Sequence, residues 1–271
     1  DILDNGIEST HLGNTKTFPC PIDADILPCI CTADDALLEL SMDCSAVTSD
    51  AQLENAFAAD IPIPYITYLT INGATGLNTI TDTTFGEAYF SYVTITGTTL
   101  SVIEDGAFLK SEDYLIDLDL SNNNIETFPF DLMTDYVTLE SLSLSGNSID
   151  SASSIASNSL TTVDLSSNPG IQFDSSLFAS SPSLQNIYMR DCGITDIGLN
   201  MFNSLPVLET IDLGSNNIDT LGSYAIVLPA DTLTSLVFDS NPLTTVDIDF
   251  LDGECERQLR IILWTALKCI N

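Results

Sequence analysis

One recurring pattern restricts the fold of this chain more than any other feature of its sequence. An apolar residue is followed by two variable positions, a second apolar residue, one variable position and a third apolar residue, and in most copies an Asn or Cys stands three positions further on. The eight copies begin at Ile66, Phe90, Leu115, Leu139, Leu160, Leu184, Leu208 and Leu233. Successive copies are 21 to 25 residues apart, so no unrelated domain fits between them.

Repeats of this spacing and composition are typical of leucine-rich repeat solenoids, in which each copy forms one coil. The alternating apolar trio predicts a short strand in each coil with one side facing inward, and the stacked strands then form a parallel sheet. We therefore expect an α/β solenoid, a horseshoe of about eight coils with a concave parallel sheet, over residues 65–251. A solenoid also explains how 271 residues fold without one compact core, because each coil buries its apolar side on its neighbours.

Two further columns of residues are explained by the coils. An inward amide at the end of each strand pairs backbone groups that would otherwise be buried unpaired, at a cost of about 1 to 3 kcal/mol each. The expected column is Asn123, Asn147, Asn168, Asn216 and Asn241, with Cys192 taking the same place in one coil. Ala74 and Thr98 stand there in the first two copies, so those coils should be irregular. The expected inner spine on the far side of the coils is Phe85, Phe108, Met133, Phe178, Phe202 and Phe250.

A cluster of cysteines before the coils predicts an amino-terminal cap. The cap spans residues 20–64, after a polar leader at 1–19, and its cysteines are Cys20, Cys29, Cys31 and Cys44. An end coil has no neighbour to cover its apolar side, and so small a cap needs disulfides for stability. Cys29 and Cys31 are too close in sequence to pair comfortably, which leaves Cys20 paired with one or the other. The alternative, a zinc site, lacks the C-x2-C spacing and the histidines.

Two more cysteines, Cys255 and Cys269, enclose a segment whose apolar residues recur at helical spacing. This predicts a helical carboxyl-terminal cap over residues 252–271, closed by a disulfide between the two. The segment holds three of the six basic residues, namely Arg257, Arg260 and Lys268. We expect them to pair with nearby carboxylates in preference to forming a docking site. The remaining cysteine, Cys192, is then a free buried thiol of low reactivity.

The net charge limits the classes of partner. It is formally −33, while hydrophobic residues make up 44% of the chain, so the acidity belongs to the surface of a folded protein. Such a surface repels nucleic acid and anionic membranes, and leaves a basic protein, a cation or a neutral ligand as partners. No apolar run approaches the roughly 20 residues of a membrane span. The opening residues do not resemble a signal peptide, so we expect a processed, secreted, extracellular protein.

The sequence offers no convincing catalytic set, and we expect no catalytic residue, no metal-ligand set and no cofactor. His11, the only histidine, lies in the polar leader, which argues against triads that use histidine as the base. Acidic pairs such as Asp117 and Asp119 fall on the solvated side of a strand, without the contrast in environment that a glycosidase needs. Weak calcium binding by carboxylates, or a bound apolar ligand, remains open.

The variable strand positions define the surface available for binding. Most are short, polar or acidic, and their Ser and Thr residues are also explained by the preference of strands and solvent for them. Protein interfaces centre on Trp, Tyr or Arg, so two places stand out: Tyr68 beside Tyr92, and a patch of Tyr188, Arg190 and Asp164. The full set of candidate protein-binding residues is Tyr68, Tyr92, Asp117, Asp119, Asp164, Tyr188, Arg190, Asp212 and Asp239.

Three short motifs in the chain resemble one group of proteins. They are Cys29-x-Cys31, the MDCS stretch at 42–45 and Phe128-Pro129-Phe130. Together with the cap and the array, from Cys20 to about Phe250, they resemble the arthropod secreted leucine-rich repeat proteins grouped with the non-catalytic subunit of oplophorus-luciferin 2-monooxygenase. The carboxyl-terminal segment is not covered by this resemblance.

The resemblance implies disulfides between Cys20 and Cys31 and between Cys29 and Cys44. It also implies a secreted, acidic, non-enzymatic scaffold that associates with a smaller catalytic or ligand-carrying protein. Our leading hypothesis is therefore an accessory or scaffold subunit in a hetero- or homo-oligomer. The alternatives are a carrier or complex subunit that holds a small apolar ligand or pigment, and a carboxylate-dependent hydrolase.

Overall fold

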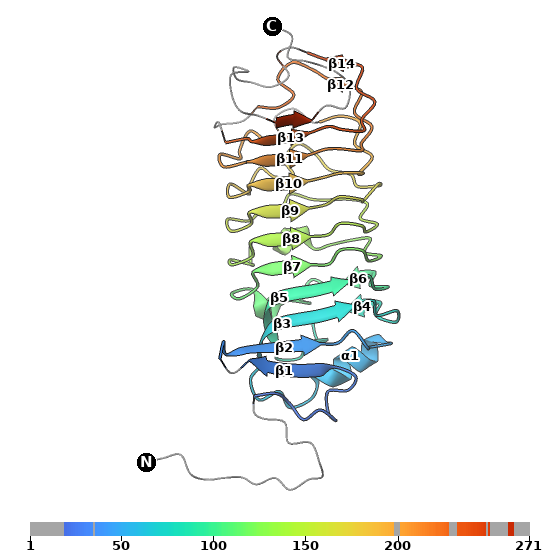
Figure 1. The fold of residues 1–271 in the computed structure, drawn as a ribbon, viewed down its shortest axis with the longest axis vertical. Coiled ribbons are helices and arrows are strands. Elements are labelled where there is room, and N and C mark those ends of the chain that lie inside the picture. Colours follow the sequence, from blue (N-terminus) through green and yellow to red (C-terminus); the bar gives the residue numbers. More distant parts are fainter. Residues whose placement is uncertain are drawn as a thin grey trace, which may run out of the picture.

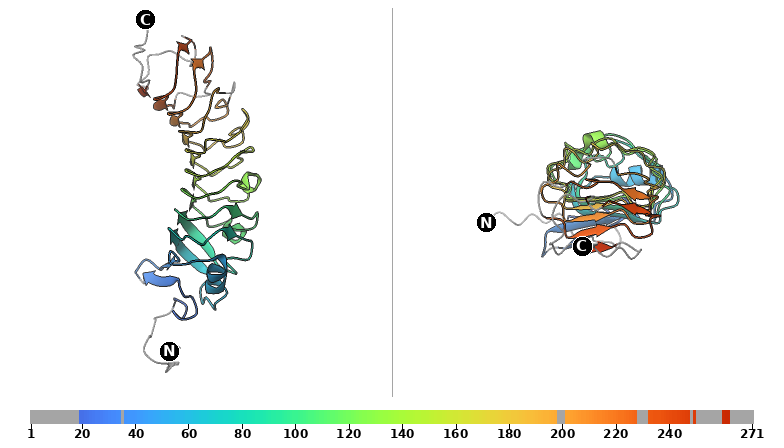
Figure 2. Two further views of the ribbon diagram at one scale, coloured as in Figure 1. Left: turned by 90° about the vertical axis from the view of Figure 1, so that its right-hand side faces the viewer. Right: turned by 90° about the horizontal axis from the view of Figure 1, so that it is seen from above.

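The computed structural model of the chain describes residues 19–34, 36–197, 201–227, 232–247, 249 and 260–262. These residues form a rod of stacked coils, and their strands make one eleven-stranded sheet in the order β1-β2-β3-β5-β7-β8-β9-β10-β11-β13-β15 (Figure 1). Figure 2 shows the strands gathered along one side of the rod, which curves towards them. The predicted leucine-rich repeat solenoid with its parallel sheet is confirmed.

The array begins with two long strands, β3 (Tyr65–Asn72) and β5 (Tyr89–Thr96), and continues with shorter ones. The shorter strands are β7 (Asp117–Asp119), β8 (Ser141–Ser143), β9 (Thr162–Asp164), β10 (Asn186–Tyr188), β11 (Thr210–Asp212) and β13 (Ser235–Val237). In each of these, the middle residue is buried and the two flanking residues are half-buried, which is the alternation that the repeat predicts. Neighbouring strands pair in parallel with equivalent positions opposite each other, as Leu118 lies opposite Leu142.

The opposite side of the coils consists mainly of turns. Its regular elements, among the described residues, are β4 (Thr79–Ile80) paired with β6 (Val102–Ile103), β12 (Thr220–Leu221) paired with β14 (Thr245–Val246), and the 3-10 helices η1 (Leu109–Ser111) and η2 (Phe130–Leu132). Such short elements let each coil return within about two dozen residues.

The asparagine column forms a ladder along the inside of the turns. Nδ2 of Asn147 donates to the carbonyl of Leu120 in the preceding coil at 3.0 Å and to that of Leu144 in its own coil at 2.9 Å. Its Oδ1 accepts the backbone N–H of Ile125 at 3.0 Å. Amide-to-carbonyl bonds of the same kind recur at Asn123, Asn168, Asn216 and Asn241. The predicted ladder is confirmed, and it ties successive coils together through otherwise unpaired backbone groups.

Cys192 occupies one place in this ladder with a weaker donor. Its Sγ lies 3.2 Å from the carbonyl oxygen of Leu165, where an asparagine amide would donate in another coil. A thiol lacks the amide oxygen that accepts a backbone N–H elsewhere, and the preceding turn closes on itself instead, with the N–H of Ile171 donating to the carbonyl of Asn168 at 3.1 Å. Cys192 is free and buried, and burial raises the pKa of its thiol to about 11.

The interior contains the predicted spine. Its described members, Phe85, Phe108, Met133, Phe178 and Phe202, are all buried. The ring of Phe85 stacks on that of Phe108 at 5.6 Å and meets the edge of Phe57, from the cap, at 5.1 Å. Phe250, the last predicted member, lies outside the described residues. The cap therefore contributes an aromatic ring to the same core as the coils.

The amino-terminal cap consists of an antiparallel hairpin, β1 (Ile30–Asp34) with β2 (Glu39–Asp43), and the helix α1 (Asp50–Phe57). Because β2 pairs in parallel with β3, the hairpin extends the sheet and covers the first coil. The disulfides are Cys20–Cys31 and Cys29–Cys44, the two pairs that the resemblance implies.

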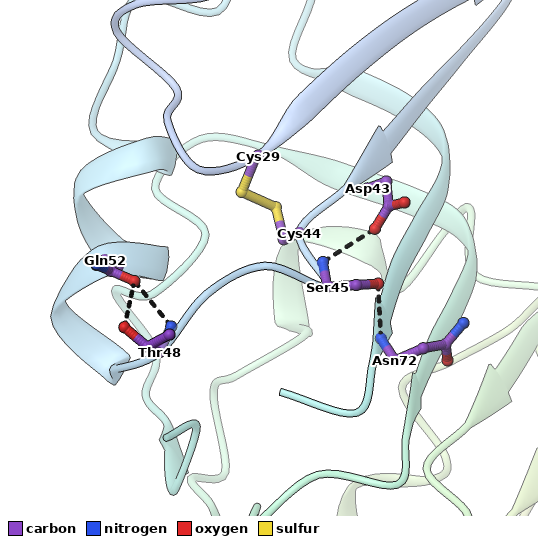
Figure 3. The surroundings of a disulfide bond; sticks show 7 residues. All are labelled: Cys29, Asp43, Cys44, Ser45, Thr48, Gln52 and Asn72. Carbon is purple, nitrogen blue, oxygen red and sulfur yellow. Dashed lines mark hydrogen bonds between the residues drawn. A yellow bond between two sulfur atoms is a disulfide. The ribbon is translucent and has the colours of Figure 1, made fainter. Parts of the chain in front are cut away.

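Figure 3 shows how one disulfide lies beside the junction of cap and array. Cys29 is bonded to Cys44 at the end of β2. In the next residue, Ser45, the backbone N–H donates to the carboxylate of Asp43 at 2.9 Å and the side-chain oxygen accepts the N–H of Asn72, in β3, at 2.9 Å. The disulfide thus closes the cap internally, and hydrogen bonds join the cap to the first coil.

The carboxyl-terminal prediction is wrong at β15 (Arg260–Ile262), which is a strand and not part of a helix. β15 pairs in parallel with β13, with Ile261 opposite Leu236. Ile261 thus stands in register as the second apolar residue of one further coil. Gln258 takes the first apolar position of that copy, which hid the repeat. A strand is favoured here because it pairs the backbone groups along the edge of β13.

The rest of the predicted carboxyl-terminal cap, including the expected disulfide between Cys255 and Cys269, lies outside the described residues.

Candidate protein-binding surface

The candidate binding residues all lie on the strands of the sheet or just after them, on its outward side, which we call the sheet face. The parallel register aligns them in columns that cross the strands, with Tyr68, Tyr92 and Asp117 as neighbours in one column and Asp164, Tyr188 and Asp212 as neighbours in the next. The structure therefore separates the candidates into two groups. One lies on the first three coils and the other on the fifth to eighth.

The first group is built around Tyr68 and Tyr92. Their rings lie opposite each other on β3 and β5 and stack with centroids 5.0 Å apart and planes 18° apart. Tyr68 is 36% exposed. Desolvation raises the pKa of its hydroxyl, and the nearby carboxylate of Glu39 raises it further. On the other side of the pair, Asp117 lies opposite Tyr92 in β7. Two stacked rings are thus flanked by a carboxylate at each end.

Asp117 is a half-buried carboxylate. Its desolvation raises its pKa, the charge of Asp119 raises it further, and a hydrogen bond with Ser141 lowers it. No ion pair with Asp117 is present in the part of the chain that the structure describes. The carboxylate therefore carries an uncompensated charge in a partly desolvated place.

Three more tyrosines, Tyr65, Tyr89 and Tyr114, gather at the edge of the sheet next to this pair. Their ring centroids are 4.6 to 5.9 Å apart, and the hydroxyl of Tyr65 lies 2.8 Å from that of Ser91. Sequence analysis missed them because they precede the apolar trio. The signal was present, since each of the three stands immediately before the first apolar residue of one of the first three copies.

Three aspartates of the sheet face have a structural role at the strand ends. The carboxylates of Asp119, Asp164 and Asp212 each accept the backbone N–H two residues further on, at 2.9, 2.8 and 2.8 Å. Bonds of this kind stabilise a turn as the chain leaves a strand. These side chains are therefore explained in part by the fold.

Arg190 is held by its own chain and turns away from Asp164. Its Nη1 and Nη2 donate to the two carboxylate oxygens of Asp239 at 2.7 and 2.6 Å, and Nη1 lies 3.2 Å from Oδ1 of Asp212. The hydrogen bonds to Asp239 raise the pKa of Arg190, and those from Arg190 lower the pKa of Asp239. We call this arrangement the Arg190 clamp. It neutralises the positive charge that the sequence offered as a binding anchor.

The Arg190 clamp depends on Gly214, which lies in the coil between that of Arg190 and that of Asp239. A Cβ atom at position 214 would overlap Nη1 of Arg190 and approach Oδ1 of Asp239 to 2.5 Å. Only a residue without a side chain leaves this path open.

The described residues contain no group of three or more His, Cys, Asp or Glu side chains placed to hold a metal ion. His11 lies outside them. None of their helices has the length and apolar character needed to cross a membrane.

Comparisons with known proteins agree with the architecture. Residues 91–149 match a family model described as leucine rich repeat, and residues 182–225 match one described as two copies of leucine rich repeats. The non-catalytic subunit of oplophorus-luciferin 2-monooxygenase from Oplophorus gracilirostris is 33% identical over 245 residues, which cover 89% of this chain and 67% of that protein.

Solved structures show the same fold at low identity. TLR13 in its ssRNA13 complex matches 80% of this chain with a TM-score of 0.53 and 23% identity, and the Toll–Spatzle complex of Drosophila matches 78% with a TM-score of 0.58 and 17% identity. This chain spans only 26% and 31% of those two chains. The leucine-rich repeat domain of the type III effector XopL matches 75% of this chain and 73% of its own, with a TM-score of 0.54 and 17% identity.

Proposed function

The chain belongs to the family of leucine-rich repeat proteins that includes the non-catalytic subunit of oplophorus-luciferin 2-monooxygenase, and we propose that it is a secreted, non-enzymatic accessory subunit that binds another protein. The observation that carries this proposal is the similarity to a non-catalytic subunit along 89% of the chain. That relative is, by its name, one subunit of an enzyme and not the catalytic one.

The shape of the molecule supports a binding role. The sheet face runs along the whole rod, and every coil contributes outward-facing strand positions that are at least partly accessible. A preformed surface of this kind binds a partner without ordering itself first, which lowers the entropic cost of association. The acidic groups on it support a non-enzymatic role, because Asp119, Asp164 and Asp212 all accept the same turn hydrogen bond. The two carboxylates of a glycosidase need contrasting environments, which these three aspartates do not have.

Secretion is supported by the cap. Its Cys20–Cys31 and Cys29–Cys44 disulfides are stable in oxidising, extracellular compartments. The net charge of −33 makes copies of the chain repel each other, which favours solubility.

The test is native mass spectrometry of the protein isolated, without denaturation, from the fluid of its source. We expect a complex of fixed stoichiometry that contains a second, different polypeptide. Recovery of the chain only as a free monomer at its natural concentration would overturn the proposal. Turnover of a glycan panel by the purified chain, lost on Asp117→Asn, would overturn its non-enzymatic part.

A further inference from the structure

We propose that the Tyr68–Tyr92 pair and the carboxylates that flank it form a binding site for a lysine- or arginine-bearing segment of the partner protein. This inference rests on the proposed function, since it names the kind of partner segment that the accessory subunit binds. We call the site the tyrosine platform and define it as Glu39, Tyr68, Tyr92 and Asp117.

The geometry of the tyrosine platform fits a cation. One face of the Tyr68 ring contacts the ring of Tyr92. On the other side, the residue opposite Tyr68 in β2 is Ser41, whose short side chain leaves the second ring face accessible. The face of an aromatic ring attracts Lys and Arg through its quadrupole. A cation that approaches this ring face also comes near the carboxylate of Glu39, whose charge acts on the Tyr68 hydroxyl.

The charges of the tyrosine platform are uncompensated. Neither Glu39 nor Asp117 makes an ion pair within the described part of the chain. Desolvation and the neighbouring Asp119 raise the pKa of Asp117, so its charged form is disfavoured in the free protein. A cation bound beside it would reverse this penalty. Binding energy is therefore available to a positive side chain, and is not available to a neutral one.

The other aromatic position on the sheet face, Tyr188, has a cation of the same chain beside it. Tyr188 lies two residues from Arg190, whose guanidinium already pairs with Asp239 and contacts Asp212. A positive side chain of a partner would meet a positive guanidinium there. The cation-binding part of the sheet face is therefore at its amino-terminal end.

A separate cluster of tyrosines lies where the same strands begin. Tyr65 and Tyr89 stand three residues before Tyr68 and Tyr92 on the same strands, and Tyr114 is 45% exposed. The aliphatic stems of Lys and Arg pack on apolar surface while their charged ends remain in polar surroundings. The stacked rings of Tyr68 and Tyr92 offer such stems an apolar support next to the carboxylates that hold the charged ends.

The overall charge of the chain favours a basic partner over a second copy or nucleic acid. With a net charge of −33, two copies of this chain repel each other, and so do this chain and nucleic acid. A basic protein is attracted over a distance, and at the tyrosine platform it meets carboxylates that its own positive side chains can pair with. We therefore assign the site to a basic segment of a different protein.

The test uses the full chain and a fluorescent peptide of alternating Arg and Ser, with binding followed by fluorescence anisotropy at ~150 mM salt. We expect the double variant Tyr68→Ala with Tyr92→Ala to weaken binding about tenfold, because two exposed cation–ring contacts are lost without any change of charge. The matched control is Tyr224→Ala, which removes a 53% exposed tyrosine away from the sheet face, and it should leave the affinity unchanged. The pair Tyr68→Phe with Tyr92→Phe keeps the rings and should bind like the wild type.

A second comparison separates local binding from general attraction. Asp117→Asn should weaken the peptide affinity several-fold, whereas Asp105→Asn, an equal change of charge at an exposed turn outside the sheet face, should not. Equal effects of these two variants, or no effect of the double alanine variant, would overturn the site. Self-association of the wild type that is abolished by the double alanine variant would also overturn it, because the occupant would then be a second copy.

The outcome is distinguishable from failure of the proposed function. If the native complex forms equally well with the wild type and with the double alanine variant, the accessory function stands and the tyrosine platform is rejected. If no complex forms with either protein, but the peptide still binds at the platform, the accessory function is rejected and the site stands.

Discussion

The guanidinium of Arg190 reaches across one entire coil to the carboxylate of Asp239, with its two terminal nitrogens 2.7 and 2.6 Å from the two oxygens. The residues are 49 positions apart in sequence. A two-point contact of this kind is stronger than a single-point ion pair and fixes the orientation of both groups. Arg190, one of only six basic residues on this acidic protein, is therefore already paired within the molecule.

Gly214→Ala should break the Arg190 clamp, because the new methyl group occupies the path of the guanidinium. We expect a loss of about 1 kcal/mol in the free energy of unfolding, since the pair is partly exposed to solvent. Urea denaturation measures the change. Gly222→Ala is the matched control, because a Cβ atom at Gly222 meets nothing within 4 Å. An equal loss in the two variants would contradict the role of Gly214.

The Arg190 clamp should also make stability depend on pH. Arg190 holds the pKa of Asp239 below its ordinary value of 3.8. The carboxylate therefore contributes stability that is fully present above about pH 4 and is lost as the pH falls through the lowered pKa. The difference in unfolding free energy between the wild type and Asp239→Asn should narrow between neutral pH and pH of about 2. A difference that stays constant over this range would show that the charge of Asp239 is not involved.

The asparagine ladder should be among the most sensitive parts of the fold. Asn147→Ala leaves the N–H of Ile125 without its side-chain partner, and it removes one of the two amide donors to the carbonyl of Leu120, which keeps Asn123. Because a buried group left unpaired costs about 1 to 3 kcal/mol, we expect a loss of about 2 kcal/mol in chemical denaturation. Asn158→Ala, at an exposed position, is the control and should change stability little. Similar losses at both positions would argue against the ladder as the cause.

Cys192 should be protected from thiol reagents in the folded protein. Burial raises the pKa of its thiol to about 11, so very little thiolate is present at neutral pH. Peptide mapping after treatment with iodoacetamide should find Cys192 unmodified in the native protein and fully modified in guanidinium chloride. Rapid modification under native conditions would show that the ladder opens at this coil.

The coils could be predicted from the sequence because each depends on contacts between equivalent positions of adjacent repeats. The apolar trio, the asparagine ladder and the phenylalanine spine all follow from that periodicity. The Arg190 clamp could not be predicted from the sequence. It joins residues two copies apart, and the arginine side chain passes over Gly214 in the copy between them. Repeat spacing places Arg190 beside Asp164 as a binding anchor. Its long side chain instead reaches Asp212 and Asp239, which spacing does not predict.

Two other features had a signal that the repeat pattern obscured. Tyr65, Tyr89 and Tyr114 recur at one repeat position outside the apolar trio, so their convergence follows from register once the register is known. At the carboxyl end, Gln258 interrupts the trio, and the remaining apolar residues also fit a helical period. Over so short a segment, the periodicity of apolar residues does not distinguish a helix from a strand. The strand forms because it pairs with β13.

In a solenoid, each coil normally contacts only the coils on either side, so unfolding can begin at an end and proceed one coil at a time. The contact between Arg190 and Asp239 joins a coil to its second neighbour and spans the one between them. The eighth coil cannot fray without releasing the arginine of the sixth. We therefore expect the last three of the eight coils to exchange their amide hydrogens as one cooperative unit, and Gly214→Ala to divide that unit into independently opening coils.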